Sequence, residues 1–313
     1  MRYGRYQFTS RLESEAILPY YKGSTFRGVF GIALKKVVCA LKRLVCSECL
    51  LKQRCVYALA FETSGSLNLP EKSRIASPPH PFVIEPPLTN ERDFSKEDSF
   101  DFNLLLFGEI NNSLPYFIYA FDQMGRIGVG KRINGKRGQF ALKRVKLDGK
   151  IIYTDTDQKL NIDESFATLS LSEPNNYSQN NFRLKITLET PLRIKFENRL
   201  KTDLPFHALV RAMLRRVSSL HNFYGGGEPP LDYRGLVKRA DAIRIIETDL
   251  RWFDWERYSN RQEQRMMMGG ISGSITYEGH MMEYMPLVDF CSEVHIGKQT
   301  SFGLGKFKGE ILK

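Results

Sequence analysis

The sequence predicts an α+β fold made of two similar domains in tandem, and three observations support this. The chain has 313 residues, about twice the length of an average domain. Apolar residues make up 42% of it, which is enough for two ordinary cores. Strand-like and helix-like segments also follow one another in the same order in the two halves. We therefore expect one structural unit to occur twice.

The first half opens with a predicted strand over residues 6–12 and a helix that begins at Ser24 or Thr25. From Phe26 to Val38, apolar residues recur every three or four positions, which places them on one face of the helix. Either hydroxyl residue is a suitable N-cap. A second helix over residues 114–124, a glycine-rich turn and a strand over residues 140–147 complete this half.

The second half repeats this plan. Residues 182–188 alternate between apolar and polar, which is typical of a half-buried strand. The later segments predict a helix through 209–217, strands over 242–250 and 271–277, a helix over 281–293 and a strand over 306–312. This order is that of a ferredoxin-like (RRM-like, βαββαβ) domain. We expect two such domains, an N-terminal one over residues 1–175 and a C-terminal one over residues 176–313.

Two irregular segments interrupt the pattern. A polar connector over residues 148–181 contains Asn175 and Asn176 and joins the two halves. Residues 70–87 are rich in proline, which argues against a regular helix or a central strand. We interpret this segment as an insertion in the N-terminal domain.

The charge balance points to a polyanionic partner. Lys and Arg number 46 against 35 Asp and Glu, a formal net charge of +11. Cations of this number on a surface bind phosphate backbones by releasing counterions. No apolar run approaches the roughly 20 residues of a membrane-spanning helix, and the first residues lack the apolar stretch of a signal peptide. We expect a soluble, cytoplasmic protein that binds nucleic acid.

Four of the five cysteines lie close together. Cys39, Cys46, Cys49 and Cys55 form the pattern C-x6-C-x2-C-x5-C. A C-x2-C pair lets two thiolates bind one tetrahedral metal ion, the flanking cysteines would supply the other ligands, and basic neighbours favour thiolates over thiols. The pattern predicts a structural zinc site, with an iron–sulfur cluster as a second possibility and four reduced cysteines at a helix end as the alternative.

A glycine-rich segment near the C-terminus is a second candidate site. Its glycines would let backbone N–H groups approach a phosphate, and the neighbouring side chains add donors. The spacing matches neither a P-loop nor a dinucleotide-binding fingerprint, and a tight turn is the alternative interpretation. The candidate phosphate-binding residues are Gly297, Lys298, Thr300, Ser301, Gly303 and Gly305.

Two basic segments also predict contacts with nucleic acid. Seven cations lie within residues 131–146, where they would repel one another without a partner; we select Lys131, Arg132, Lys136 and Arg137 as candidates. Residues 251–265 interleave arginines with aromatic side chains, a combination that grips phosphates and stacks bases. The candidates in this segment are Arg257 and Arg261. A solvated hairpin and partly buried tryptophans are the alternative interpretations.

The glycine-rich segment carries a resemblance to a known family. Ile296-Gly297, then five residues, then Gly303-Leu304-Gly305, resembles the C-terminal GhG-x5-GhG motif of RAMP proteins of CRISPR systems, with His295 in place of the first glycine. Together with the segment 206–217, the second half is similar to the Cas6 branch, which cuts precursor CRISPR RNA within its repeats. The resemblance implies tandem ferredoxin-like domains of the RAMP type, in agreement with the repeated pattern.

The resemblance also implies a metal-independent reaction without a catalytic cofactor. A 2′-hydroxyl attacks the adjacent phosphate and leaves a 2′,3′-cyclic phosphate and a 5′-hydroxyl, so the site needs a base, an acid and a cation. Family members commonly use a histidine near the first helix, often with Tyr or Lys. The matching stretch here offers Tyr20, Tyr21 and Lys22 but no histidine. Tyr20 with a desolvated Lys22 is therefore one candidate pair.

Histidines elsewhere supply further catalytic candidates. His295 adjoins the glycine-rich segment, and His207 opens the helix of the second half, the counterpart of the family's usual histidine position. Packing or capping is the alternative role for both. His80 and His221 are considered as well, whereas His280 is expected at the surface.

The sequence thus predicts an endoribonuclease that binds and cuts CRISPR repeat RNA in its precursor. The alternative is a non-catalytic RAMP protein that holds CRISPR RNA in an effector complex, because the first-helix histidine is missing. A zinc-dependent hydrolase is excluded, since the clustered cysteines would saturate the metal and no H-E-x-x-H motif exists. We expect a monomer or a homodimer with no membrane partner.

Overall fold

The computed structural model describes the chain except for residues 43, 68–76, 163–165, 173–180, 195–202, 260–263 and 313, and omits the side chains of 257–259, 264 and 265. The chain divides into two compact units, Met1–Thr168 and Leu169–Lys313. This division falls within the polar connector predicted over residues 148–181. Among the described residues, no helix is long and apolar enough to cross a membrane.

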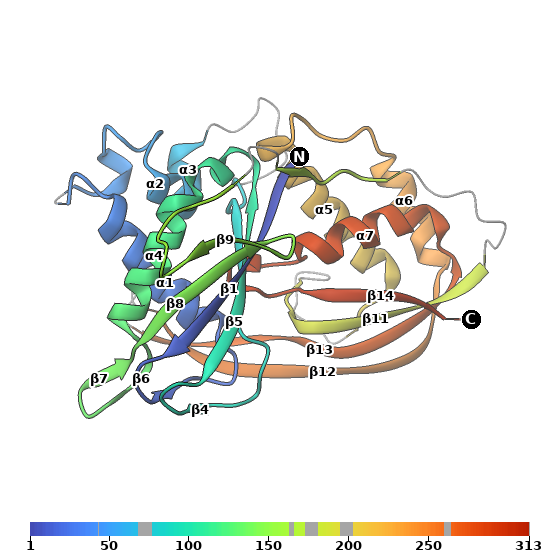
Figure 1. Cartoon of the computed structure of the whole chain (residues 1–313). Coiled ribbons are helices and arrows are strands. Elements are labelled where there is room, and N and C mark those ends of the chain that lie inside the picture. The colour runs from blue at the N-terminus through green and yellow to red at the C-terminus, as the bar shows by residue number, and fades with distance from the viewer. Residues whose placement is uncertain are drawn as a thin grey trace. The chain divides into compact units, whose positions relative to one another are not determined.

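The first unit is built on a six-stranded sheet (Figure 1). Its elements are β1 (Arg2–Leu12), β2 (Ala16–Ile17), α1 (Gly23–Val38), η1 (Cys46–Glu48), α2 (Val56–Phe61), α3 (Thr63–Ser66), β3 (Phe82–Glu85), β4 (Asp93–Phe94), β5 (Ser99–Phe107), η2 (Gly108–Ser113), α4 (Leu114–Ile127), β6 (Val129–Ile133), β7 (Lys136–Gly138), β8 (Phe140–Leu147), β9 (Lys150–Thr154) and β10 (Ala167–Thr168). The strand order is β3-β5-β1-β8-β9, with β10 pairing with β1, and all the pairs are antiparallel.

Both long helices of this unit pack on one face of the sheet. The ring of Phe30 in α1 stacks on that of Phe121 in α4, with centroids 4.3 Å apart. Phe121 also lies 4.8 Å from Phe8 of β1, measured between ring centroids. Because side chains alternate along a strand, burying Phe8 against the helices turns its neighbour Gln7 to the opposite face. Polar residues of β1 therefore line the face that the helices leave uncovered.

A small sheet of order β4-β2-β6-β7 lies at the start of α1. Ile17 of β2 pairs with Lys131 of β6, and also with Asp93 of β4. Gly130 makes this pairing possible, because a Cβ there would lie 2.3 Å from the carbonyl oxygen of Ile17, at φ +83°. The glycine-rich turn after α4 thus brings a basic strand beside the segment that leads into α1.

The second unit is built on a four-stranded antiparallel sheet of its own. Its elements are β11 (Asn181–Leu192), α5 (Phe206–Tyr224), α6 (Tyr233–Arg239), η3 (Ala240–Ala242), β12 (Arg244–Ser259), β13 (Gln264–His280), η4 (Met282–Tyr284), α7 (Met285–Val294), η5 (Thr300–Phe302) and β14 (Phe307–Leu312). The strand order is β12-β13-β11-β14, which corresponds to β3-β5-β1-β8 of the first unit. The predicted α+β class and the tandem ferredoxin-like repeat are confirmed.

The structure corrects several predicted elements. Ser24 and Thr25 do not cap α1 but lie inside it, because Lys22 already has helical dihedral angles and accepts the first helical hydrogen bond from Phe26. The proline-rich segment contains a strand, β3, which is compatible with its prolines because it lies at the edge of the sheet. β12 and β13 extend well beyond the predicted 242–250 and 271–277, as a long hairpin.

Candidate nucleic-acid interface

Tyr20 is presented to solvent beside an arginine at the start of α1. Its side chain is 60% exposed, and the guanidinium of Arg92 lies over its ring, 4.9 Å from the centroid. The backbone fixes this arrangement, because the N–H of Leu18 donates to the carbonyl of Arg92 at 2.8 Å. Sequence reasoning selected Tyr20 but missed Arg92, which comes from a segment about seventy residues further on with no motif to mark it.

Lys22 does not share this exposure. Its side chain is 1% exposed, and its Nζ donates to the carbonyl oxygens of Thr89 at 2.7 Å and Tyr20 at 3.3 Å. Burial lowers the pKa of Lys22, which is the direction expected for a desolvated lysine, although the nearby Glu91 opposes this lowering. An ammonium directed at backbone carbonyls fixes the loop around Tyr20. The structure therefore favours Lys22 as a positioning residue over direct contact with a substrate.

A basic strand pair lies next to the Tyr20 segment. Lys131 and Arg132 on β6 and Lys136 on β7 are exposed, and Arg137 is half-exposed. None of the acidic side chains that the structure describes forms an ion pair with these four residues. Four unpaired cations on a two-stranded ribbon are suited to a phosphate backbone. Together with Tyr20 and Arg92, they form the candidate interface, which lies within the first unit.

A histidine does lie against the first helix, although none is present in its sequence. Nε2 of His80 lies 3.1 Å from Nη2 of Arg27 on α1, and its Nδ1 lies 2.8 Å from the carbonyl oxygen of Ala60. His80 follows Pro78 and Pro79, in the segment that sequence reasoning treated as an insertion. Both of its ring nitrogens have protein partners, which favours a structural role in this arrangement.

The glycine-rich loop, residues 295–306, is held by backbone hydrogen bonds, both within the loop and to the end of β11. Gly305 donates to the carbonyl of Pro191 at 3.0 Å, Gly303 to Thr300 at 2.7 Å, and Lys298 to Arg193 at 2.7 Å. These three N–H groups are therefore engaged within the protein in this structure. Of the candidate phosphate-binding residues, Thr300, Ser301, Gly303 and Gly305 are buried, whereas Gly297 and Lys298 are exposed.

His295 lies in the same loop and is fully buried. Its Nδ1 lies 3.1 Å from the carbonyl oxygen of Leu304. The preceding carbonyl, that of Val294, accepts hydrogen bonds from Nε and Nη2 of the buried Arg216 at 3.1 and 2.8 Å. A general acid or base must reach its substrate. The structure thus favours a structural role for His295, as part of the loop's support.

His207 contacts an aspartate at the start of α5. Its Nδ1 lies 2.9 Å from Oδ1 of Asp241, and its side chain is 21% exposed. This contact joins the first turn of α5 to η3, which is the packing or capping role considered for it.

The four clustered cysteines are half-buried, and the structure does not support a metal site among them. No three His, Cys, Asp or Glu side chains of the described residues are grouped so that they could hold a metal ion. Burial raises the pKa of Cys46, and although Lys35 opposes this, the neighbouring Glu62, Cys55 and Cys39 raise it further. The expected preference for the thiolate is therefore wrong for Cys46, because desolvation outweighs the basic neighbours.

The arginine–aromatic segment falls mainly on β12. The side chain of Arg257 and the whole of Arg261 lie outside the described residues. Trp252 is 36% exposed and donates from Nε1 to Asp254 at 2.7 Å, whereas Trp255 is buried, 5.6 Å from Phe253 between ring centroids. One of the two tryptophans is thus partly available for stacking.

Two ferredoxin-like units in tandem, with a glycine-rich loop before the last strand, define a RAMP protein. The family model AF_1859_N, an N-terminal domain, matches residues 1–165, and the family model of the CRISPR-associated endoribonuclease Cas6 matches residues 186–307. The chain thus belongs to the AF_1859_N family over its first unit, and its second unit matches the Cas6 family of RAMP proteins. The Cas6 match supports a role in CRISPR RNA processing or binding.

A relative and several solved structures are similar to this chain over nearly its whole length. An uncharacterized protein of Archaeoglobus fulgidus is 24% identical over 300 residues, which cover 93% of this chain and 92% of the relative. The structure of Thermus thermophilus Cas6 (TTHB231) matches with a TM-score of 0.54 at 11% identity, covering 99% of this chain and 98% of that one. A chain of a partial Cas6-RT-Cas1–Cas2 complex matches with a TM-score of 0.57 at 14% identity, covering 99% of this chain and 46% of that one. At these identities the structural likeness establishes the fold.

The conformation of the glycine-rich loop can be tested by Gly305→Ala. The φ of Gly305 is +77°, and a Cβ there would lie 1.8 Å from the carbonyl oxygen of Ile296. We expect the variant to lose clearly more stability than the roughly 1–2 kcal/mol of left-handed strain alone. The matched control is Gly226→Ala, which has φ +87° but nothing within 4 Å. Urea unfolding followed by tryptophan fluorescence reports on the second unit, which holds both tryptophans; equal losses in the two variants would contradict the expectation.

The ion pairs of Glu189 on β11 with Lys306 and with Lys308 on β14 predict that the stability of the fold depends on pH. Partial burial raises the pKa of Glu189, but hydrogen bonds and charge from Lys308 and Lys306 hold it on balance below its ordinary value of 4.5. A lowered folded-state pKa stabilises the fold above the unfolded value, and this contribution is lost as the pH falls through the folded-state pKa. We expect Glu189→Gln to cost about 1 kcal/mol or less at pH 7. The melting temperatures of Glu189→Gln and of the unsubstituted chain should converge below pH 4.5. A difference that does not change with pH would exclude the ion pairs as its cause.

Proposed function

We propose that this protein is a metal-independent endoribonuclease that cleaves precursor CRISPR RNA within its repeats, with Tyr20 and Arg92 at the reacting phosphate. The exposed tyrosine beneath an arginine, at the start of the first helix, is the observation that carries the proposal. It lies beside the cations of β6 and β7, which have no acidic partner among the described residues. The match of residues 186–307 to the Cas6 family supports the reaction class.

The reaction needs a base, an acid and a positive charge near the phosphate. The 2′-oxygen attacks the adjacent phosphorus while its proton goes to a base, and the bond from phosphorus to the 5′-oxygen breaks. The 5′-oxygen then takes a proton, which leaves a 2′,3′-cyclic phosphate and a 5′-hydroxyl. The guanidinium of Arg92 would neutralise the negative charge that develops on the phosphate. The hydroxyl of Tyr20 would donate to the departing oxygen, and Lys22 would hold the loop in place.

A second function, RNA holding without cleavage, is favoured by the placement of the histidines. His295 is buried and His207 is paired with Asp241, so neither of the two selected histidines is presented to a substrate. The RNA would then follow the same basic strands, and Tyr20 would stack on a base. A test of whether the protein cleaves the RNA distinguishes the two functions.

The catalytic assignment predicts that Tyr20→Phe and Arg92→Gln each slow cleavage by about 10² or more, the usual scale for one acid–base group or one charge-stabilising group. Binding of the RNA should change much less, because the cations of β6 and β7 remain. The measurement is cleavage of an end-labelled repeat RNA in EDTA, with a 2′-deoxy substitution at the cut as substrate control.

Tyr119→Phe is the matched control variant, since Tyr119 is also well exposed but lies on α4. It should cut at the unsubstituted rate. If Tyr20→Phe cleaves the RNA at the rate of the unsubstituted chain, Tyr20 has no catalytic role. Tight binding without any cleavage by the unsubstituted chain would favour the RNA-holding function instead.

The basic strands predict a measurable change in salt dependence. Each contact between a cation and a phosphate of single-stranded RNA contributes roughly 0.7 to the slope of log affinity against log salt concentration. Lys131→Ala combined with Lys136→Ala should therefore make this slope shallower by about 1.4. Lys36→Ala with Lys42→Ala, two exposed lysines elsewhere in the same unit, is the control that should leave it unchanged. Equal slopes in the two double variants would place the RNA elsewhere.

A further inference from the structure

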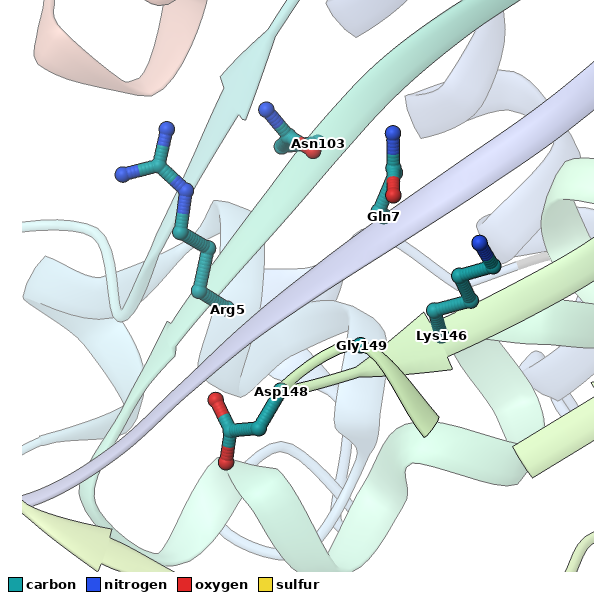
Figure 2. A pocket seen from close by; sticks show the side chains of 6 residues that line it. All are labelled: Arg5, Gln7, Asn103, Lys146, Asp148 and Gly149. Carbon is teal, nitrogen blue, oxygen red and sulfur yellow. The ribbon is translucent and has the colours of Figure 1, made fainter. Parts of the chain in front are cut away.

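The sheet of the first unit carries a pocket on the face that α1 and α4 leave uncovered. The pocket has a volume of about 290 Å³, near the lower end of small-ligand pockets. Figure 2 shows its lining: side chains from three neighbouring strands and the turn after β8. The lining residues are Arg5, Gln7, Asn103, Lys146, Asp148 and Gly149. None of these belongs to the interface around Tyr20.

Three of the side chains form a row across the sheet. Gln7 of β1 pairs with Asn103 of β5 on one side and with Lys146 of β8 on the other. Directly paired residues point to the same face of a sheet, with Cβ atoms about 5 Å apart. Two amides and an ammonium are therefore placed side by side by the strand register alone.

The hydrogen bonds of the two amides engage their nitrogens. Nδ2 of Asn103 donates to Oε2 of Glu85 at 2.7 Å, and Nε2 of Gln7 donates to Oδ2 of Asp101 at 3.2 Å. Among the described residues, no donor is bonded to the amide oxygen of either side chain. Glu85 is 2% exposed and also binds Arg5 at 2.8 Å, so the arrangement is firmly held. The pocket thus offers two adjacent acceptors.

The pocket also holds charges of both signs. Lys146 forms no hydrogen bond or ion pair with the described residues, and Arg144, one row further along β8, is exposed. The carboxylate of Asp148 lines the pocket from the turn after β8. A ligand that carries an N–H₂ group for the two acceptors and an anionic group for Lys146 would engage both kinds of side chain. A nucleotide with an amino base has this combination.

We propose that this pocket binds one nucleotide of a single-stranded RNA, with the exocyclic amine of adenine or cytosine donating to the amide oxygens of Gln7 and Asn103, and with Lys146 on the phosphate. The inference rests on the proposed function in that the RNA is the same substrate. It adds a second contact, on the opposite side of the sheet from the helices, and a base preference. Uracil has a carbonyl oxygen where cytosine has the amine, so it would place an acceptor against two acceptors.

Fluorescence anisotropy with labelled (A)8, (C)8 and (U)8 RNA tests the proposal. The unsubstituted chain should bind (A)8 and (C)8 about fivefold or more tightly than (U)8, on the scale of one hydrogen-bonded base edge. Gln7→Leu should abolish this preference. Lys146→Ala should weaken the binding of all three RNAs by a similar factor, and Lys36→Ala on α1 should change nothing.

Equal affinity of the unsubstituted chain for the three RNAs would overturn the proposal, as would a base preference that survives Gln7→Leu. Should Gln7→Leu prove unstable, Lys146→Ala gives an independent measurement, because Lys146 has no partner among the described residues. Affinities equal to those of Lys36→Ala would overturn the phosphate contact. Cleavage of repeat RNA in EDTA by the same preparations reports on the proposed function separately. A chain that prefers (A)8 but never cuts the repeat would support the pocket and contradict the nuclease.

Discussion

The stacked contact between Phe30 and Phe121 is the interaction on which the first unit depends. With ring centroids 4.3 Å apart, it holds α1 and α4 side by side on one face of the sheet. Once both helices are fixed there, the start of α1 and the end of α4 lie over the same small sheet, and Gly130 brings β6 beside β2. The exposed tyrosine and the basic strands are thus placed by the core rather than by the loops that carry them. The opposite face of the sheet is left to polar side chains.

Much of this fold follows from local patterns, because the patterns and the packing agree. The strand predicted over 140–147 has the observed bounds of β8, and the apolar faces of the predicted helices are the buried faces of α1, α4 and α5. β5 was missed although its alternating phenylalanines, Phe100 and Phe102, carried the signal. The short strand β3 could not be read from sequence, since prolines flank it and only its place at the sheet edge permits it.

The sites were less predictable, because long-range pairing assembles them. Arg92 has no motif, and it reaches Tyr20 only through the pairing of β4 with β2. Gln7, Asn103 and Lys146 become neighbours only through the register of β1, β5 and β8, which no local pattern encodes. The burial of individual side chains was the other property that the sequence patterns did not predict. It removes His295 from solvent and turns Lys22 inward, although both were selected for a chemistry that their residue types can perform.

His295 shows what the glycine-rich motif does in this chain. Its φ of 60° and ψ of 155° lie in a region that is almost exclusive to glycine and costs about 1–3 kcal/mol for other residues. The motif's first glycine is therefore replaced while its conformation is kept. The strain is held by the contact with Leu304 and by Arg216, a buried cation that binds the carbonyl of Val294 and whose pKa is lowered by burial to about 10. A loop that served only to expose backbone N–H groups would need neither support. Its hydrogen bonds run to Pro191 and Arg193 at the end of β11, so the loop fixes how the last strand joins the sheet.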